Sequence, residues 1–305
     1  MMQDWAGWLL MLFSFSIVLM WKRVRSDTKV VHAIWFCIFM HHTVAFLNVY
    51  LGGVIGTEGD ARTFHFYGAD ASVEPEIGFW TNPRVTYTNT LGFFYHAFGT
   101  SFLLGDELSV LAFTLSCIVL VRLVSLLDLE RFRIGIILLF GLLPSAAIFR
   151  SVTLRESWQA LFFLLSVYWA IRLWKRPGIL ILLFMLMSAF CMGSLHAALA
   201  KYAIYLIVIS LLWYIFSLKT RVRWPLYIRI LFAGLFITCL IISLQKIELF
   251  MTLEEAVKDG ASTRKALLSY DTRTNFSSIL DTSSVHGIVT IVPMVFVEYM
   301  FAPFP

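Results

Sequence analysis

The segment TEGDARTFHFYGADA carries the densest group of side chains able to do acid–base chemistry in this chain. Within eight residues it places Glu58, Asp60, Arg62 and His65. A carboxylate beside a histidine can act as a general base on a sugar hydroxyl. We therefore take Asp60, Glu58 and His65 as candidate catalytic residues and Arg62 as a candidate substrate-binding residue.

The same segment also allows a purely structural interpretation. Thr57 and Asp60 have the spacing of a capping box, in which Asp60 only caps a helix at the membrane surface. A carboxylate at a helix N-terminus is held in a fixed direction. Capping and catalysis are therefore compatible, and both interpretations stay open.

A second polar group lies in the segment LPSAAIFRSVTLRESWQ. Pro144 predicts a kink or the end of a helix. Arg150 and Arg155 are candidates for binding phosphate or pyrophosphate, because a guanidinium fork matches these anions, although both could simply snorkel to the membrane surface. Ser151, Arg155 and Gln159 repeat every four residues, which predicts a polar stripe along one helix face.

Further candidates for substrate binding stand farther along the chain. His196 occupies a tight turn in GSLHAALAKY, and Lys201 lies one turn inside the next apolar run. Arg264 and Arg273 belong to a long polar segment that suits an anionic or carbohydrate ligand, but a solvated loop has a similar composition. Glu298 lies inside an apolar run, where an ionisable residue suggests a functional role.

No metal site, cofactor or disulfide framework is predicted. The pair His41 and His42 has no third ligand at a usable spacing, so we interpret it as a packed or water-lined feature. A divalent metal stays an open alternative that no ligand spacing supports. The four cysteines fall inside separate apolar runs and are too scattered to bind a metal or to staple outer loops.

The composition indicates which elements must position these side chains. Of 305 residues, 59% are hydrophobic and only 14% are charged, where soluble proteins have about a quarter charged. Apolar runs long enough to cross a bilayer exclude a soluble enzyme and a disordered tail. The net charge of +5 comes from short basic clusters between apolar runs, so no nucleic-acid partner is expected.

We predict an all-α, polytopic membrane protein of about nine spans, because lipid offers the backbone no hydrogen-bond partner. The expected spans are Trp5–Trp21, Val30–Ile55, Leu108–Leu127, Ile134–Phe149, Trp158–Trp174, Ile179–Leu195, Ala197–Leu218, Ile230–Leu244 and about Ile288–Phe301. Leu91–Leu104 is expected to form a half-helix lying in or on the membrane.

The basic residues predict the orientation of these spans. With the N-terminus outside, the inner side receives 14 of the 24 basic residues and only three acids. The inner basic residues are Lys22, Arg23, Arg25, Lys29, Arg122, Arg131, Arg133, Arg172, Lys175, Arg176, Lys219, Arg221, Arg223 and Arg229. Every short inner loop is basic, as the positive-inside rule requires.

We expect one transmembrane domain over residues 1–305, with two long outer loops at 56–90 and 247–285. Long loops in a compact chain are usually functional or disordered, and the mixed composition of these two favours function. The C-terminal EYMFAPFP has no basic or polar tail. This ending indicates either a fragment, with further spans missing, or a C-terminus close to the membrane surface.

The order of motifs resembles a known group of enzymes. GTEGDARTFHFY after the second span, then TLRESWQ and later SLHAAL, is similar to the EpsG/Wzy-type bacterial polysaccharide polymerases and to the wider family of polytopic GT-C glycosyltransferases. The resemblance covers about Val30 to Tyr205. It implies that Asp60 is the acidic loop residue, Arg155 the arginine of the Leu-Arg motif and His196 the outer-turn histidine.

This chain departs from the pattern of that family in three ways. No arginine precedes the Gly-Asp motif, Glu156 stands where the family has glutamine, and one span is added at the N-terminus relative to GT-C enzymes. These departures leave the subfamily open, and with it the donor and the acceptor.

We therefore expect a glycosyltransferase or polymerase in the bacterial cytoplasmic membrane, acting at its outer face in surface polysaccharide assembly, such as exopolysaccharide or O-antigen. Its donor would be a sugar on a polyprenyl phosphate or pyrophosphate, and its partners the bilayer and other polysaccharide-assembly proteins. Two alternatives stay open. One is a transporter or flippase of a lipid-linked or anionic solute. The other is a non-catalytic scaffold of an envelope-assembly complex.

Overall fold

The computed structural model describes residues 4–51, 58–77, 82–217 and 234. In the first of the two units into which the chain divides, residues 1–221, the described residues form eleven α-helices, a short 3-10 helix at Glu130–Phe132 and no strand. The helices are α1 (Trp5–Met20), α2 (Lys22–Arg25), α3 (Thr28–Tyr50), α4 (Glu58–Val73), α5 (Pro83–Phe98), α6 (Phe102–Leu126), α7 (Arg133–Leu142), α8 (Pro144–Phe149), α9 (Glu156–Lys175), α10 (Ile179–Leu195) and α11 (Ala197–Ser217).

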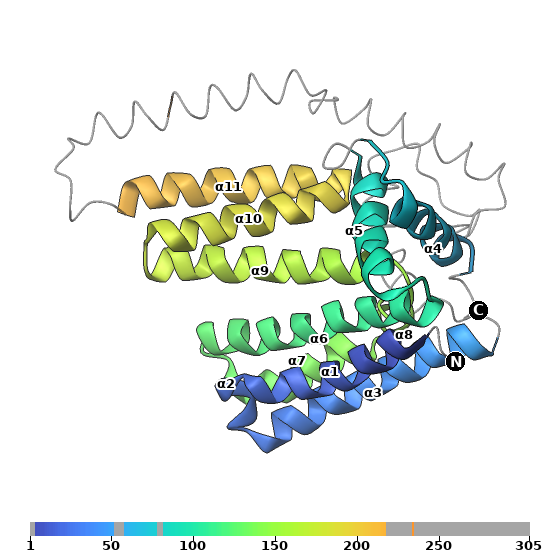
Figure 1. Cartoon of the computed structure of the whole chain (residues 1–305). Coiled ribbons are helices and arrows are strands. Elements are labelled where there is room, and N and C mark those ends of the chain that lie inside the picture. The colour runs from blue at the N-terminus through green and yellow to red at the C-terminus, as the bar shows by residue number, and fades with distance from the viewer. Residues whose placement is uncertain (1–3, 52–57, 78–81, 218–233, 235–305) are drawn as a thin grey trace, which may run out of the picture. The chain divides into compact units, whose positions relative to one another are not determined.

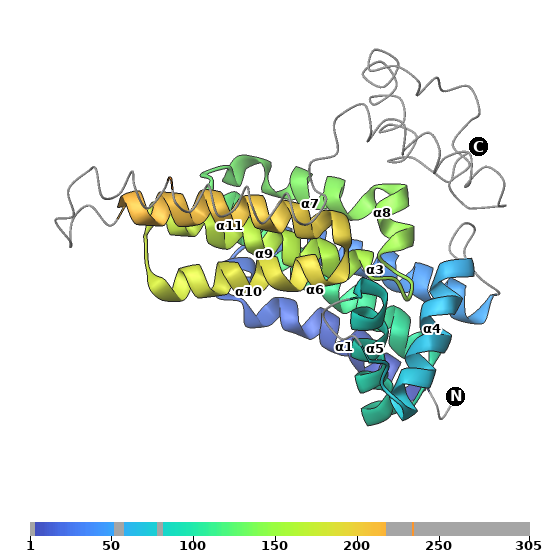
Figure 2. The same ribbon diagram turned by 90° about the horizontal axis from the view of Figure 1, so that it is seen from above.

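Long helices running side by side make up most of this unit (Figures 1 and 2). Helix α6 is central, since it packs against α1, α3 and α9, and α9 in turn contacts α10. The main core cluster joins Val18 of α1, Ile34 and Cys37 of α3, Phe113 of α6 and Ile137 of α7. A second cluster joins α6 to α9. The apolar sequence runs therefore bury their faces against one another.

Two helices, α3 and α6, are long and apolar enough to cross a membrane. Shorter apolar helical stretches are Trp5–Met20, Ile179–Leu195 and Leu199–Leu212. Many large apolar side chains on these helices are exposed, including Leu12 of α1, Phe39 of α3 and Met187 of α10. The all-α class is confirmed for the described residues. The expected span Ile288–Phe301 lies outside them, and of the expected span Ile230–Leu244 the structure describes only Gly234.

Local sequence signals explain several helix boundaries. Asp27 caps α3, Asn82 caps α5 and Ser101 caps α6, each through a side-chain oxygen that accepts a backbone N–H. Pro83 follows as the first residue of α5, where its missing N–H costs nothing. Gly99 ends α5 with a φ of 89°, a conformation that favours glycine.

The structure corrects the expected half-helix at Leu91–Leu104. The first part of this run is the C-terminal half of α5 and the last part is the first turn of α6, with the break at Gly99. The expected outer loop at 56–90 likewise holds helix α4 and the start of α5. Apolar composition does not reveal the break at Gly99, because the residues on both sides of it are mostly apolar.

The expected span Ile134–Phe149 is also two helices. Helix α7 ends at Leu142, and Pro144 starts the short helix α8. Proline ends one helix and begins the next because it lacks the N–H that a helix interior needs, yet fits the first helical position. The predicted effect of Pro144 is therefore confirmed.

Helices α4 and α5 pack on each other across the ends of the long helices, with α5 also contacting α10 (Figure 1). The α8–α9 connection and the α10–α11 turn lie at this same end. Helix α2, the α6–α7 connection and the α9–α10 connection lie at the opposite end. Of the polar segments singled out from the sequence, the three that the structure describes thus gather at one end of the helices.

Candidate functional site

A buried hydrogen-bond network fixes the non-helical connection between α8 and α9. The Thr153 hydroxyl donates to Asp106 Oδ1 across 2.6 Å, and Asn48 Nδ2 donates to Asp106 Oδ2 across 2.8 Å. Ser109 donates to the Leu154 carbonyl at 3.3 Å. Because Asp106 and Ser109 belong to α6 and Asn48 to α3, two packed helices position this connection.

The start of the same connection is held by a buried histidine. His41 Nδ1 lies 2.8 Å from Ser151 Oγ, and its Nε2–H donates to the Gly141 carbonyl across 3.1 Å. The His41 ring also stacks on Phe113, with ring centroids 3.7 Å apart. His41 is thus a satisfied packing residue, as one of the two sequence interpretations proposed.

Helix α4 packs against this fixed connection. Ala61 forms a small apolar cluster with Val152 and Leu154, and Phe64 adds to it. The Arg155 guanidinium carbon lies 5.7 Å from the centre of the Phe64 ring. Arg155 is half-buried and stands immediately before the first residue of α9. The first turns of α4 and the start of α9 therefore meet around Phe64 and Arg155.

Helix α5 completes one wall of the site with Tyr87. The Tyr87 ring meets the Phe64 ring edge-on at 5.1 Å, and only 3% of Tyr87 is exposed. Burial raises the pKa of Tyr87, and the charge of Glu156 raises it further. The charge of Arg155 lowers the pKa of Tyr87, so Arg155 lies close enough to act on this side chain. Tyr87 is a neutral hydrogen-bonding group at any ordinary pH.

The α10–α11 turn places His196 close enough to Arg155 for the charge of the arginine to act on it. Partial burial lowers the pKa of His196, and the positive charge of Arg155 lowers it further. Gln159, one turn into α9, donates from Nε2 to the Leu195 carbonyl at 3.4 Å. The structure therefore brings together Arg155 and His196, which the sequence placed in separate motifs.

Asp60 and Arg62 are both exposed on the first turns of α4. Asp60 is the third residue of α4, the position that the capping-box pattern gives it, whereas Thr57 lies outside the described residues. Asp60 precedes Phe64 by one helical turn, so the two share a face of α4. Arg155 lies over Phe64. Asp60 and Arg155 therefore lie on the same side of α4. Of Glu58 the structure describes only the backbone, at the start of α4.

His65 faces another direction. It is 5% exposed, its Nδ1 lies 2.8 Å from the Tyr95 hydroxyl, and its ring stacks on Phe102 at 3.5 Å. Burial lowers the pKa of His65 to about 4. His65 therefore joins α4 to α5 and α6 as a neutral ring, away from the face that carries Asp60 and Phe64.

Arg150 lies at the end of α8 and turns back toward α7. Its Nη1 donates to the Phe140 carbonyl across 3.1 Å, and its guanidinium carbon lies 4.1 Å from the centre of the Phe140 ring. The Arg150 carbonyl accepts a hydrogen bond from Ser157 at 3.0 Å. Arg150 thus supports the α8–α9 connection. Of the two arginines, only Arg155 lies at the face of α4 that carries Phe64.

The predicted stripe of Ser151, Arg155 and Gln159 on one helix face is wrong. Residues 151–154 are not helical, and α9 begins only at Glu156. Ser151 is fully buried beside His41, whereas Arg155 and Gln159 are half-buried at the start of α9. The hydroxyls of this segment bond to side chains of α3 and α6, which competes with helix formation.

The sequence interpretation missed Asp106 and Glu107. Both are inside α6 and at most 1% exposed, and Glu107 lies 2.9 Å from His42 Nδ1. The span was expected to start at Leu108, so the two acids were assigned to the preceding loop. The signal was an Asp-Glu pair inside a continuous apolar run, where ionisable residues are costly and often functional.

The remaining candidates are not part of the cluster that the structure describes. Lys201 is exposed on α11. Arg264, Arg273 and Glu298 lie outside the described residues. Within the described ranges, no three His, Cys, Asp or Glu side chains gather closely enough to hold a metal ion.

Comparison with known proteins finds no matching family model, no matching curated protein and no matching solved structure.

Proposed function

We propose that the chain is a membrane glycosyltransferase or polymerase, and that the cluster around Arg155 binds the phosphate of its lipid-linked sugar donor. The observation that carries this proposal is the convergence of Arg155, His196 and Tyr87 beside the face of α4 that holds Asp60. An arginine fork recognises phosphate oxygens, the neutral histidine can supply a further hydrogen bond, and the buried Tyr87 ring forms the wall beside Phe64.

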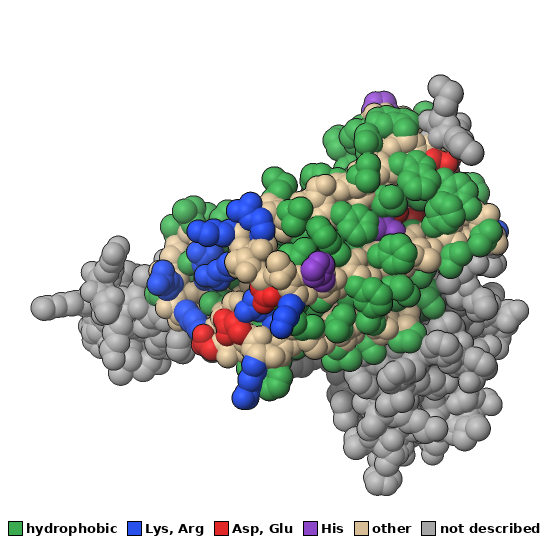
Figure 3. Space-filling model, turned by 90° about the horizontal axis from the view of Figure 1, so that it is seen from below, with side chains coloured by type: hydrophobic (Ala, Val, Ile, Leu, Met, Phe, Trp, Pro, Cys, Tyr) green, Lys and Arg blue, Asp and Glu red, His purple; other side chains and the backbone are tan. Residues whose placement is uncertain are grey.

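The two ends of the helices differ in a way that supports this proposal. On the face drawn in Figure 3, Lys and Arg side chains gather toward one end, the end of α2 and the α9–α10 connection. By the positive-inside rule this end faces the cytoplasm of a bacterial cell. The Arg155 cluster then lies at the outer face of the cytoplasmic membrane, where a flipped polyprenyl-linked sugar presents its phosphate.

The proposed reaction is a displacement at the anomeric carbon of the donor sugar. The acceptor hydroxyl oxygen forms a bond to this carbon while the bond from the carbon to the phosphate oxygen breaks. Asp60 takes the proton of the hydroxyl, and the leaving phosphate keeps the electron pair. Arg155 stabilises the charge that grows on this phosphate, and His196 assists from the α10–α11 turn. In enzymes that stabilise a developing negative charge in this way, each donor is worth about 3–4 kcal/mol.

An apolar pocket supports a lipid-linked donor. It has a volume of about 310 Å³ and is lined by apolar side chains of α1, α5 and α6, among them Trp5, Phe94 and Leu108. Helix α5 connects this pocket to the cluster, because it carries Phe94 near one end and Tyr87 near the other. One helix thus borders both the phosphate cluster and a place suited to isoprenoid units.

Transport is the second candidate, and the buried pair His42 and Glu107 favours it. Ionisable side chains within membrane-length helices are typical of proton or ion coupling in transporters. These residues lie in α3 and α6, the two helices that meet the length and apolarity needed to cross a membrane. A flippase or permease would use this pair rather than the Arg155 cluster.

Reconstitution distinguishes the candidates. Purified protein in liposomes is given a radiolabelled polyprenyl pyrophosphate-linked sugar and an acceptor glycan on the outer-facing side. Transfer produces labelled glycan, transport moves label across the bilayer without a new bond, and a scaffold does neither. The proposed function expects labelled glycan, and transport without transfer would overturn it.

The proposed orientation has its own test. Asp70 is exposed on α4 and Glu130 is exposed at the opposite end. In whole cells, a membrane-impermeant maleimide should label Asp70→Cys and leave Glu130→Cys unlabelled until the membrane is opened. The reverse pattern would contradict an outer-face site.

A further inference from the structure

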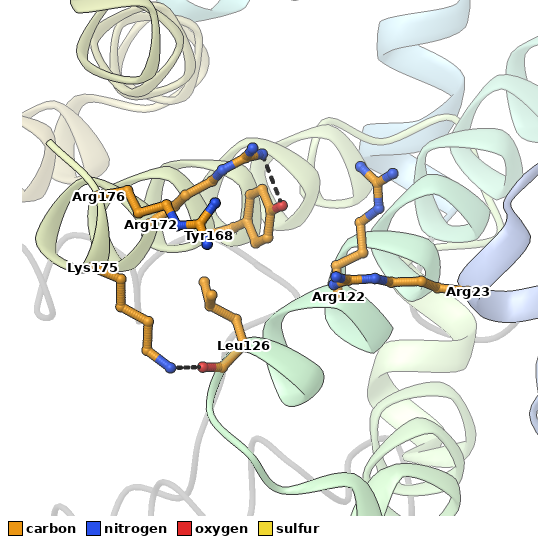
Figure 4. Close-up of a pocket in the computed structure, with 7 residues that line it drawn as sticks. All are labelled: Arg23, Arg122, Leu126, Tyr168, Arg172, Lys175 and Arg176. Carbon is orange, nitrogen blue, oxygen red and sulfur yellow. Dashed lines mark hydrogen bonds between the residues drawn. The ribbon is translucent and has the colours of Figure 1, made fainter. Parts of the chain in front are cut away.

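A pocket at the opposite end of the helices gathers five basic side chains. It has a volume of about 490 Å³, and the described residues that line it include Arg23, Arg122, Tyr168, Arg172, Lys175 and Arg176. Arg23 comes from α2, Arg122 from α6, Arg172 and Lys175 from the last turn of α9, and Arg176 follows them. In Figure 4, Arg23 and Arg122 lie on one side of the pocket, and Tyr168 with the α9 basic residues on the other.

The positive charges of this pocket are largely unbalanced by the chain itself. In the part of the chain that the structure describes, Lys175 pairs with Asp128 at 3.4 Å, but Arg23, Arg122, Arg172 and Arg176 have no carboxylate within 4.0 Å. Arg122 also lies close enough to Arg23 and Arg172 for their charges to act on it. Like charges held this close repel one another, and a bound anion would offset that repulsion.

The arginines are held in place by aromatic side chains rather than by acids. The Arg122 guanidinium carbon lies 4.0 Å from the centre of the Trp21 ring, and that of Arg172 lies 5.2 Å from Trp169. Arg172 Nη1 also donates to the Tyr168 hydroxyl across 3.3 Å. Stacking fixes the direction of a guanidinium and leaves N–H groups able to bind a ligand.

The location of the pocket identifies the ligand chemistry. Trp21 directly follows the last residue of the apolar helix α1, where tryptophans mark the membrane–water boundary, and Trp169 lies in the C-terminal half of α9. Basic pockets between membrane helices on the cytoplasmic side bind phosphate-bearing lipid headgroups. We propose that this pocket binds the phosphate groups of an anionic membrane lipid whose headgroup carries more than one negative charge. This site is separate from the Arg155 cluster, and its test does not depend on sugar transfer.

Lipid titration of the purified full chain tests the proposal. Apparent Kd values are measured by native mass spectrometry for bisphosphatidylglycerol, which carries two phosphates, and for zwitterionic phosphatidylcholine. Inorganic pyrophosphate is a third ligand, which distinguishes a soluble phosphate from a headgroup. We expect tight binding of bisphosphatidylglycerol and weak binding of phosphatidylcholine. Pyrophosphate binding as tight as that of the lipid would support the phosphate site and assign it to a soluble ligand.

Variants connect this binding to the pocket. Each basic residue near a membrane surface contributes about fivefold in affinity, so Arg122→Gln with Arg172→Gln should weaken bisphosphatidylglycerol binding about 25-fold. Arg176→Gln, at an exposed position, should weaken it about fivefold without risk to the fold. Arg25→Gln is the matched control, because Arg25 is exposed on α2 and is not among the residues that line the pocket.

The proposal is overturned by either of two results. One is bisphosphatidylglycerol binding within twofold of the wild type in both the double variant and Arg176→Gln. The other is equal affinity of the wild-type chain for phosphatidylcholine and bisphosphatidylglycerol, with no binding of pyrophosphate.

Discussion

Thr153 donates a hydrogen bond to Asp106 across 2.6 Å, and this bond ties the connection before α9 to the first turns of α6. Asp106 is completely buried, and Asn48 of α3 occupies its second oxygen. The position of Arg155, two residues beyond Thr153, therefore depends on a carboxylate inside a membrane-length helix. Residues that touch no substrate can thus determine where Arg155 lies.

Removing the Thr153 hydroxyl should loosen this connection. Thr153→Val keeps the shape of the side chain but leaves the buried Asp106 carboxylate one donor short, which costs about 1–3 kcal/mol of stability. Thermal unfolding in detergent should show a lower midpoint for Thr153→Val, while Thr153→Ser, which keeps the hydroxyl, stays near wild type. Equal midpoints for the valine and serine variants would contradict the role of this bond.

Gly105 should tolerate no side chain. A Cβ at this position would collide with the Tyr95 hydroxyl and would lie 2.6 Å from Thr153 Oγ1. Overpacking of this kind costs about 1–3 kcal/mol, more than the gain of about 1 kcal/mol when alanine replaces a helical glycine. We expect a lower unfolding midpoint for Gly105→Ala. Gly135→Ala in α7 is the control, since its Cβ would meet nothing within 4 Å, and it should be neutral or slightly stabilising.

The stability of the chain should fall as acid protonates His65. The pKa of His65 is about 4 in the folded chain, below the ordinary value of 6.5, because burial disfavours the charged ring. Between pH 6.5 and pH 4 the unfolded chain therefore binds more protons, and the stabilising contribution is lost as the pH falls through this window. Unfolding midpoints between pH 7 and pH 4 should decline less steeply for His65→Gln than for wild type, and parallel curves would refute this prediction.

Arg155 should contribute to transfer through both its charge and its planar fork. Arg155→Gln should lower kcat/KM about 100- to 1000-fold, as expected when a group that stabilises a leaving phosphate is removed. Arg155→Lys keeps the charge but loses the fork, so an intermediate loss is expected.

Arg84→Gln is the matched control for Arg155. Arg84 is an exposed arginine on α5, paired with Glu76 at 3.2 Å, and such exposed pairs contribute little. Its replacement should leave kcat/KM near wild type. An equal loss in Arg84→Gln and Arg155→Gln would show a general effect of surface charge instead.

Local sequence signals predicted much of the fold. The expected boundaries of Ile179–Leu195 agree with α10, and those of Trp5–Trp21 agree with α1 to within one residue. Gly178 and His196 flank the first run, and a basic cluster follows the second. The change from apolar to polar side chains marks the helix ends there. The length of each continuous apolar run was sufficient there.

Tertiary contacts decided what local signals could not. Four-residue spacing predicted a helical stripe from Ser151 to Gln159, yet Ser151 and Thr153 bond to His41 and Asp106, far away in the sequence. No local pattern reveals a partner 110 or 47 residues distant. The same limit applies to Phe64, which contacts Arg155 only because Ala61 packs on Val152 and Leu154.

Sugar transfer by Asp60→Asn protein tests the central proposal most directly. Asparagine has nearly the same size, but it cannot take a proton from the acceptor hydroxyl, and Asp60 is exposed, so the fold should persist. In liposomes with a radiolabelled polyprenyl pyrophosphate-linked sugar, we predict an unfolding midpoint equal to that of wild type and a transfer rate at least about 100-fold lower. Wild-type transfer by the folded Asp60→Asn protein would contradict the assignment of Asp60 as the base.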